Sequence, residues 1–459
     1  MSKIKYNDVP IKEIGNVVTG KTPLTAKSEY YNGSYMFISP NELHEGYLIS
    51  KSEKTLTEKG LKSIATNSIS GTSVLVGCIG WDMGNVAICL ERCATNQQIN
   101  SITNFKSEYN PYYIYYWLLT KKEYLFSIAS VTRTPILSKG TFEDILIPVP
   151  GKPIQDKIAG VLLTIDKKIQ LNNKINQTLQ EQASLLYDYW FTQFDFPDEN
   201  GKPYKSSGGK MVWNEKLKRE IPEGWEVKSL GEIMRKNTTS FDYKSTQPTI
   251  DLSVMPSGSI SLNQINSSDE FSTNLFVMNE GDILFGSIRP YLKKAGIAPC
   301  SGAIAGTVHS YRVDSINDYN FALLTLSRDS FFEYAVRVSA GTKMPVVSSD
   351  NILAYKVPYS RSVAKLFNEI NIKSIICKNN QENQELTRLR DWLLPMLMNG
   401  QATVAEEQKP VLRVIENDTK NEQPDRFALW LQNQGLAARG DIDRKTLREI
   451  FDAMDENDK

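Results

Sequence analysis

A short stretch near the amino terminus has the spelling of a phosphate-binding loop. Gly15-Asn16-Val17-Val18-Thr19-Gly20-Lys21-Thr22 fits the pattern GxxxxGK[ST], in which backbone N–H groups and a lysine surround nucleotide phosphates. Such a loop should follow a buried strand and open a helix. Pro23 follows Thr22 directly, however, and residues 26–33 are polar and turn-like. We therefore do not expect ATP binding here.

Two further stretches imitate functional sites. Asn110-Pro111-Tyr112-Tyr113 approaches the NPPY motif of adenine methyltransferases, but the second proline is missing and no glycine-rich cofactor loop precedes it. Tyr113, Tyr116 and Trp117 continue as one face of a helix, which predicts core packing. Asp441-Ile442-Asp443 opens like a calcium loop but lacks the glycine and glutamate at positions six and twelve. We predict a helix amino-terminal cap there.

The residues that most often carry catalysis or metals are sparse. The two histidines, His44 and His309, lie far apart in sequence, and the five cysteines form no CxxC pair. A serine or cysteine triad, a zinc site and a disulfide framework are therefore all unsupported. We expect no catalytic residue, no metal and no cofactor in this chain.

Two clusters of polar side chains have the chemistry of base recognition. Asn96-Gln97-Gln98 places three amides in succession, and an amide can bond adenine N6 and N7 together. Arg289-Pro290-Tyr291-Leu292-Lys293-Lys294 combines guanidinium, aromatic and ammonium groups after an apolar run. The alternatives are amides that satisfy strand edges and a solvated turn. The candidate contacts to bases or phosphates are Lys21, Thr22, Trp81, Asn85, Asn96, Gln97, Gln98, Arg133, Lys236, Arg289, Tyr291, Lys293, Lys294, His309 and Lys343.

The elements that must position these side chains occur twice, at an offset of about 210 residues. Residues 11–15 resemble 227–231, and residues 74–79 resemble 283–288. Thr134-Pro135-Ile136-Leu137-Ser138 recurs as Met344-Pro345-Val346-Val347-Ser348, and Ile147-Pro148 is matched by Val357-Pro358. Arg133 and Lys343 each lie two residues before one of the matched prolines, Pro135 and Pro345. We expect both side chains to contact phosphate.

After each repeat the apolar spacing changes to steps of three and four, which predicts a long helix. The first should run from about Ile154 to Trp190. Asparagines interrupt both helices at matched places, and a buried amide needs a partner. An antiparallel pair would bring Asn172 near Asn383 and Asn176 near Asn379. The alternative is two ordinary amphipathic helices on separate domains. The predicted pairing residues are Ile165, Ile169, Asn172, Asn176, Leu179 and Leu186 with Ile372, Ile376, Asn379, Asn383, Leu386 and Leu393.

The overall composition bounds the class of protein. Lysine plus arginine and aspartate plus glutamate both number 53, so net charge gives no general attraction to a polyanion. Any surface for DNA phosphate must come from local clustering or from partner subunits. The sequence has no apolar run of eighteen residues and no signal-peptide pattern at its amino terminus. We expect a cytoplasmic protein that does not enter a membrane.

The sequence resembles the specificity subunit of type I restriction-modification systems. The resembling stretches lie in the family's order between residues 10 and 400: Phe37-Ile38-Ser39-Pro40, Thr95 to Asn100, Ile165 to Ile169, Leu171 to Asn176, and the connector through Ile221-Pro222-Glu223-Gly224-Trp225. The resemblance implies a non-catalytic DNA-binding subunit that reads a split site. It also implies two methyltransferase partners, which carry S-adenosylmethionine and methylate adenine N6, and restriction subunits that use ATP and Mg²⁺.

The predicted fold is α+β, with two similar target recognition domains separated by a long antiparallel two-helix coiled coil in a pseudo-twofold repeat. The expected boundaries are 1–150 for the first recognition domain, 151–197 for the central helical region and 198–225 for the connector. The second recognition domain follows at 226–358, the distal helical region at 359–400, and an acidic helical tail of open role at 401–459.

Two other functions stay open from the residues alone. The chain could be a self-contained enzyme that joins DNA recognition to methyl transfer or ATP turnover, which binding of S-adenosylmethionine or ATP hydrolysis would show. It could instead be a structural adaptor that binds no nucleic acid, which failure to retard any duplex would favour.

Overall fold

The computed structural model describes residues 5–44, 46–81, 83–131, 133–242, 245–271 and 274–402. The chain divides into two compact units, Met1–Val404 and Ala405–Lys459, and the described residues all belong to the first. The helical pair and the cap at Asp441 that we expect in the tail lie outside the described residues.

The first half of the chain folds into two four-stranded sheets. One has the antiparallel order β2 (Asn16–Thr19), β9 (Ile99–Thr103), β6 (Ser73–Gly77), β7 (Val86–Cys89). The other has the order β4 (Lys54–Leu56), β3 (Tyr31–Ile38), β8 (Cys93–Thr95), β5 (Ser68–Ile69), in which β3 and β8 are parallel. Two further pairs are β1 (Asn7–Pro10) with β12 (Leu146–Val149), and β10 (Ser130–Val131) with β11 (Pro135–Ile136). We call this body the first module.

The second half repeats the same strand orders. One sheet is β16 (Met234–Lys236), β23 (Val308–Val313), β20 (Ile283–Gly286), β21 (Ala295–Ile297). The other is β18 (Asn266–Ser267), β17 (Pro248–Ile250), β22 (Gly302–Ala305), β19 (Leu275–Met278), again with one parallel pair, β17 and β22. The outer pair is β15 (Glu226–Ser229) with β24 (Lys356–Tyr359). This body is the second module, and the internal repeat predicted from sequence is therefore structural.

Short helices on the two modules also correspond. The first module carries α1 (Ile11–Ile14), α2 (Glu58–Lys62), α3 (Pro111–Leu119), α4 (Lys122–Ser127) and α5 (Lys139–Glu143). The second carries α7 (Tyr319–Ser327), α8 (Asp329–Arg337), α9 (Ser349–Leu353) and α10 (Arg361–Phe367). Ser138 caps α5 by accepting a hydrogen bond from the Thr141 N–H, and Ser348 caps α9 in the same way. The proposed match of residues 134–138 with 344–348 is confirmed.

The match of residues 11–15 with 227–231 is wrong by three positions. The Ile11 N–H donates to the carbonyl of Ile145, and the equivalent bond in the second module runs from Leu230 to Tyr355. Ile11 therefore corresponds to Leu230 rather than to Val227. A short apolar stretch without a polar landmark aligns almost equally well in neighbouring registers.

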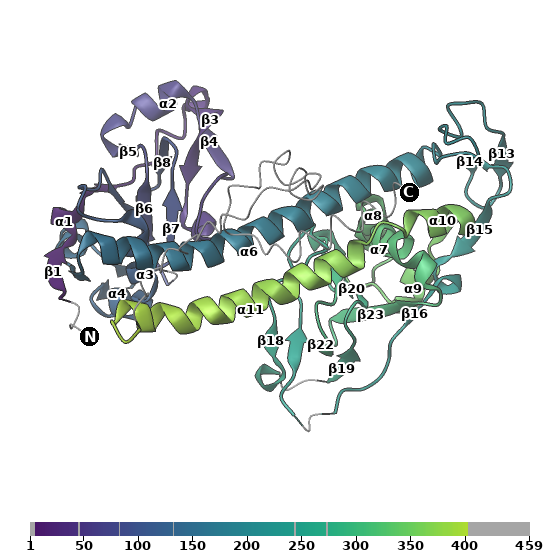
Figure 1. Ribbon diagram of the computed structural model, residues 1–459. Coiled ribbons are helices and arrows are strands. Elements are labelled where there is room, and N and C mark those ends of the chain that lie inside the picture. Colours follow the sequence, from purple (N-terminus) through teal and green to yellow (C-terminus); the bar gives the residue numbers. More distant parts are fainter. Residues whose placement is uncertain are drawn as a thin grey trace, which may run out of the picture. The chain divides into compact units, whose positions relative to one another are not determined.

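Two long helices lie side by side in Figure 1: α6 (Lys152–Tyr187) and α11 (Ile372–Met398). A π-helical turn, Asp188–Thr192, follows α6. The Asn172 side-chain amide donates to Asn383 Oδ1 at 2.9 Å, and the Asn379 amide donates to Asn176 Oδ1 at 2.7 Å. Partner numbers on α11 fall as those on α6 rise, so the two helices run antiparallel where they touch. These are the two contacts expected from the sequence.

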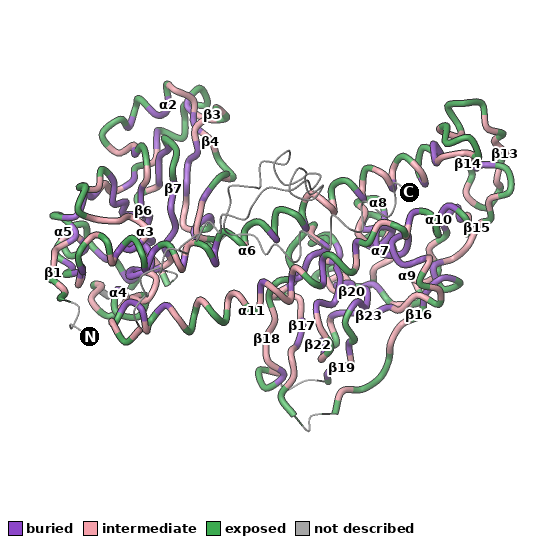
Figure 2. The backbone as a smooth tube through the Cα atoms, viewed as in Figure 1, coloured by how far each residue is buried: buried purple, intermediate pink, exposed green. Residues whose placement is uncertain are grey.

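Each long helix contributes to the cores of both modules, as the buried residues in Figure 2 indicate. Leu162 of α6 and Leu397 of α11 pack in the core of the first module. Tyr187 of α6 and Ile372 of α11 pack in the core of the second module. The amino-terminal part of each helix thus belongs to one module and its carboxyl-terminal part to the other.

The predicted pairing positions differ in burial. Buried are Ile165, Asn172, Asn176, Ile372, Ile376 and Asn383, whereas Ile169, Leu179, Leu186, Asn379, Leu386 and Leu393 are half-buried. The sequence pattern did not identify Asn380 and Leu394, which are also buried. Asn380 accepts a hydrogen bond from Asn176 at 3.0 Å.

The connector after α6 is packed rather than loose. It contains the hairpin of β13 (Met211–Asn214) and β14 (Arg219–Pro222). Trp225 lies within 6 Å, ring centre to ring centre, of Phe191, Phe194 and Phe196. These contacts join the end of α6 to the core of the second module.

A buried ionic group joins α3, α6 and α11. Asp166 of α6 is 3% exposed and accepts hydrogen bonds from Tyr116 Oη at 2.6 Å and from Arg390 Nη1 at 3.0 Å. The carboxylate therefore links the first module to both long helices.

We predict that Asp166→Ala lowers the free energy of unfolding by about 3–5 kcal/mol, because it leaves the Arg390 charge without its buried partner. Glu215→Ala, which removes one member of the exposed pair with Lys218, should give no measurable change. Urea unfolding measures both. Equal effects of the two substitutions would contradict the structural role of Asp166.

Candidate nucleic-acid interface

Backbone hydrogen bonds bring four loops of the first module to one edge. The Lys21 N–H donates to the Thr95 carbonyl at 2.9 Å, and the Cys78 N–H donates to the Gln98 carbonyl at 2.7 Å. The Gly80 N–H donates to the Pro135 carbonyl at 3.0 Å. These bonds join the loop after β2 to the end of β8, and the loop after β6 to the loop after β8 and to the start of β11, which Arg133 precedes. The candidates on these loops are Lys21, Thr22, Asn96, Gln97, Gln98, Trp81 and Arg133, and the structure brings them together.

Residues 15–22, which resemble a phosphate-binding loop, have a structural role instead. No helix follows Thr22 directly, and a Cβ atom on Gly20 would stand 2.1 Å from the Asn96 carbonyl oxygen. Glycine is therefore required so that two loop backbones can approach closely. The helix that a nucleotide site needs is missing from this part of the described chain, as the sequence predicts.

The resemblance to a methyltransferase motif is also explained. The Asn110 side chain caps α3 by accepting hydrogen bonds from the backbone N–H groups of Tyr112 and Tyr113. Tyr113 and Tyr116 are fully buried. Core packing, the structural role predicted for this stretch, is confirmed.

The three amides after β8 have different roles. Asn96 donates to Gln98 Oε1 at 2.9 Å and accepts from the Gln98 N–H at 3.0 Å, so these two side chains support the loop. Gln97 is exposed, and its Oε1 accepts a hydrogen bond from the Thr22 hydroxyl at 2.9 Å. Gln97 is the amide of the three that faces solvent.

The loop after β6 presents an aromatic ring. Trp81 is 70% exposed and its ring centre lies 5.8 Å from that of Phe126. Asn85 is a less favourable candidate for base contact, because its Oδ1 accepts from Lys122 at 2.9 Å and its amide lies 3.0 Å from His44 Nε2.

The second module forms the same edge with different side chains. The Arg289 N–H donates to the Pro345 carbonyl, and the Ser287 N–H donates to the Thr307 carbonyl. Arg289 and Lys343 are exposed, and Tyr291 is 52% exposed. The equivalent bonds place Arg289 where the first module has Gly80.

Two lysines of this second edge are already engaged. Lys293 forms an ion pair with Asp329 at 2.8 Å, and Lys294 donates to the Leu252 carbonyl. Lys293 remains 45% exposed, whereas Lys294 is half-buried. The prediction that Lys294 contacts DNA is not favoured, because its ammonium group holds a neighbouring loop.

His309 is not favoured as a DNA contact either. It is 9% exposed on β23, and its Nδ1 lies 3.1 Å from Tyr311 Oη. Burial and the positive charge of nearby Lys236 lower the pKa of His309 to about 4. Lys236 is half-buried beside it. The first four residues of β23, Val308 to Tyr311, are all buried, so this strand has no exposed face at His309, which the sequence could not show.

The chain resembles known proteins in sequence. Residues 3–181 match the type I restriction modification DNA specificity domain. The chain is 29% identical over 415 residues to the type I restriction enzyme MjaIX specificity subunit of Methanocaldococcus jannaschii, with 86% of this chain and 93% of that protein covered. It is 30% identical over 179 residues to the HindI specificity subunit of Haemophilus influenzae, which is 38% of this chain and 39% of that protein. The chain is similar to type I restriction-modification specificity subunits.

A solved structure supports the fold of this chain. The type I restriction-modification S subunit from M. genitalium superposes with a TM-score of 0.53 at 16% identity, and covers 86% of this chain and 97% of that chain. The family model that matches residues 3–181 describes a DNA specificity domain. No group of three or more His, Cys, Asp or Glu side chains suited to a metal occurs within the described ranges. No described helix is both long and apolar enough to span a membrane.

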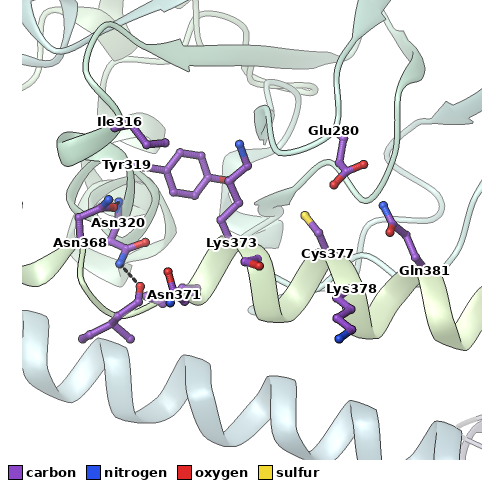
Figure 3. A pocket seen from close by; sticks show the side chains of 13 residues that line it. Glu280, Ile316, Tyr319, Asn320, Asn368, Asn371, Lys373, Cys377, Lys378 and Gln381 are labelled. Atoms are coloured by element: carbon purple, nitrogen blue, oxygen red, sulfur yellow. Dashed lines mark hydrogen bonds between the residues drawn. The ribbon is translucent and has the colours of Figure 1, made fainter. Parts of the chain in front are cut away.

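The second module has a pocket of about 380 Å³ where α11 begins (Figure 3). Lys373, Cys377 and Gln381 line it from one face of α11. The Asn320 amide at its other side donates to the carbonyls of Phe367 and Ile370, and the Lys373 ammonium lies 5.2 Å from the centre of the Tyr319 ring. These contacts fasten α11 to the second module, so the pocket is part of a structural joint.

The buried histidine predicts a pH dependence. Between pH 6.5 and about 4 the unfolded chain binds a proton at His309 that the folded chain does not. The free energy of unfolding should therefore fall as the pH is lowered, with His309 accounting for about 2 kcal/mol between pH 7.5 and pH 5. His309→Asn introduces the residue that the first module has at the equivalent position, Asn100. This substitution should remove the part of the pH dependence of unfolding that His309 contributes. Urea unfolding at the two pH values measures it, and the exposed His44→Asn serves as control. Identical slopes for wild type and His309→Asn would refute the assignment.

Proposed function

We propose that this chain is a type I restriction-modification specificity subunit that reads a split DNA site, one half with each module. We further propose that α6 and α11 form a coiled coil that sets the distance between the halves. The observation that carries the proposal is the repeat: two modules with the same strand order share both long helices between their cores. Two similar modules in a symmetric arrangement suit the binding of two half-sites on one duplex.

The length of the helices fits such a spacer. α6 has 36 residues and spans about 54 Å at 1.5 Å per residue. One turn of B-form DNA is about 34 Å long, so α6 is longer than one turn of the duplex. The asparagine contacts fix the register of the pair, so the spacing of the modules would be set by the protein and not by the DNA.

The exposed edge of each module supplies the proposed DNA contacts. Exposed cations would neutralise phosphate, which contributes much of the affinity but no sequence information. Lys21, Arg133 and Lys343 are such cations, and Lys293 would have to leave its ion pair with Asp329 to join them. Gln97, Arg289, Tyr291 and Trp81 would enter a groove, with Thr22 supporting Gln97.

The long helices also supply a proposed docking surface for partners. Their exposed large apolar side chains are Leu171, Ile175, Leu185, Ile375, Leu389 and Trp392. We propose that two methyltransferase subunits dock there, bring S-adenosylmethionine and methylate adenine N6 in each half-site. Restriction subunits with ATP and Mg²⁺ would complete the complex for cleavage.

The test of the proposed function is a map of N6-methyladenine. The gene is expressed with its methyltransferase partner in a host that lacks N6-adenine methylation, and the genome is sequenced by a method that detects the modified base. We expect one split motif, two short sequences separated by a fixed gap, that is absent without this chain. A map that does not depend on the chain would refute the proposal.

We predict that Trp392→Ser weakens association with the methyltransferase subunits by about tenfold or more, because exposed aromatic residues at an interface carry much of its energy. Trp213→Ser is the matched control: Trp213 is 59% exposed on the connector hairpin and Trp392 is 61% exposed on α11. Titration calorimetry measures both. Equal affinities for the two variants would place docking away from α11.

A further inference from the structure

The loop after β8 holds one amide that is oriented and still exposed to solvent. Asn96 and Gln98 bond each other, whereas Gln97 contributes only its Oε1 to a hydrogen bond, from the Thr22 hydroxyl. No hydrogen bond from Gln97 Nε2 to another described residue is present. The amide group therefore keeps both N–H donors and one lone pair of Oε1 for a ligand.

Thr22 holds the Gln97 side chain at its amide end. Its hydroxyl donates to Oε1 at 2.9 Å, and in this arrangement Nε2 lies on the side of the amide away from that bond. The Thr22 loop is itself fixed, because the Lys21 N–H bonds the Thr95 carbonyl and Gly20 packs against the Asn96 backbone. The side chain is thus held in place before DNA arrives.

An amide held in this way matches one base. Adenine presents an acceptor, N7, next to a donor, the N6 amino group, in the major groove. Gln97 Nε2 can donate to N7 while Oε1 accepts from N6. Guanine presents two acceptors at the same edge, so it would meet the amide oxygen with an unpaired acceptor.

The second module lacks this feature. The Cys78-to-Gln98 bond of the first module corresponds to the Ser287-to-Thr307 bond of the second, so Gln97 corresponds to Gly306. Glycine has no side chain for base recognition. The feature therefore acts on one half-site only, which makes the other half-site an internal control.

We propose that Gln97, positioned by Thr22, recognises an adenine in the half-site that the first module reads. The proposal rests on the function proposed above and adds the identity of one base and the residue that selects it. Gln97 is the specificity-determining residue, and Thr22 is a positioning residue that acts through it.

The test compares methylation maps of variants co-expressed with the methyltransferase partner. Gln97→Ala should relax one adenine position of one half-site, with about 10- to 100-fold loss of discrimination there and no change in the other half. Gln97→Glu should favour cytosine at that position, because a carboxylate accepts from the cytosine amino group.

Thr22 is tested at the same base. Thr22→Val should reduce discrimination at that position by about 2- to 10-fold, since it removes a single neutral hydrogen bond. Thr22→Ser, which keeps the hydroxyl, should restore it. Gln170→Ala, which truncates an exposed glutamine of α6, should leave every base of the motif unchanged.

The outcomes separate this inference from the proposed function. A wild-type map without a split motif refutes the proposed function. A split motif that Gln97→Ala leaves unchanged, or relaxes at a base other than adenine, overturns the inference alone. Loss of all methylation in Gln97→Ala also overturns it, because truncation of an exposed side chain should leave folding and assembly intact.

Discussion

The buried hydrogen bonds between the asparagine side chains of α6 and α11 are the constraint on which the rest of the structure depends. Asn172 bonds Asn383, and Asn176 bonds both Asn379 and Asn380. An apolar seam would tolerate sliding by one helical turn, but a buried amide that loses its partner costs about 1–3 kcal/mol. The asparagines therefore select one register at some expense of stability.

The same contacts extend into the second module. Ser261 accepts a hydrogen bond from Asn176 at 3.0 Å and donates to Asn380 at 2.8 Å. Gln180 of α6 donates to the Gly258 carbonyl and accepts from the Ile260 N–H. The loop of residues 258–261 is thus tied to the helices at the place where their register is fixed. Both module cores also contain residues of the two helices. A change in the register of the helices would therefore move the edge of one module that is proposed to contact DNA relative to that of the other.

Much of this arrangement could be predicted from the sequence, because its strongest signals are repeated. Polar residues at matched places in two apolar patterns identified the asparagine contacts, and paired prolines identified equivalent loops. Apolar stretches without such landmarks did not identify equivalent positions reliably. Residues 11–15, for example, were aligned three positions away from their true equivalents. Asn380 was missed because a pattern of apolar steps of three and four along one helix cannot show that Ser261, from the second module, packs against the helix pair and bonds Asn380.

The recognition edge was harder to predict than the fold. Residue type suggested that Lys294 and His309 contact DNA, but the first holds a loop and the second is buried. Whether a polar side chain in a loop or at a strand end supports the backbone or faces solvent depends on tertiary contacts. The chemical difference between Gln97 and its two amide neighbours therefore became visible only in the structure.

The proposed role of the helix pair is to set the distance between the two half-sites, and the length of the gap between half-sites tests that role most directly. Purified complex would be given duplexes that carry the same two half-sites separated by the natural gap, or by one or two base pairs more or fewer. Each added pair moves a half-site by about 3.4 Å and turns it by about 34°. A rigid helix pair predicts methylation of one spacing and loss of most activity at its neighbours. Equal methylation across all spacings would show that the helices do not set the distance.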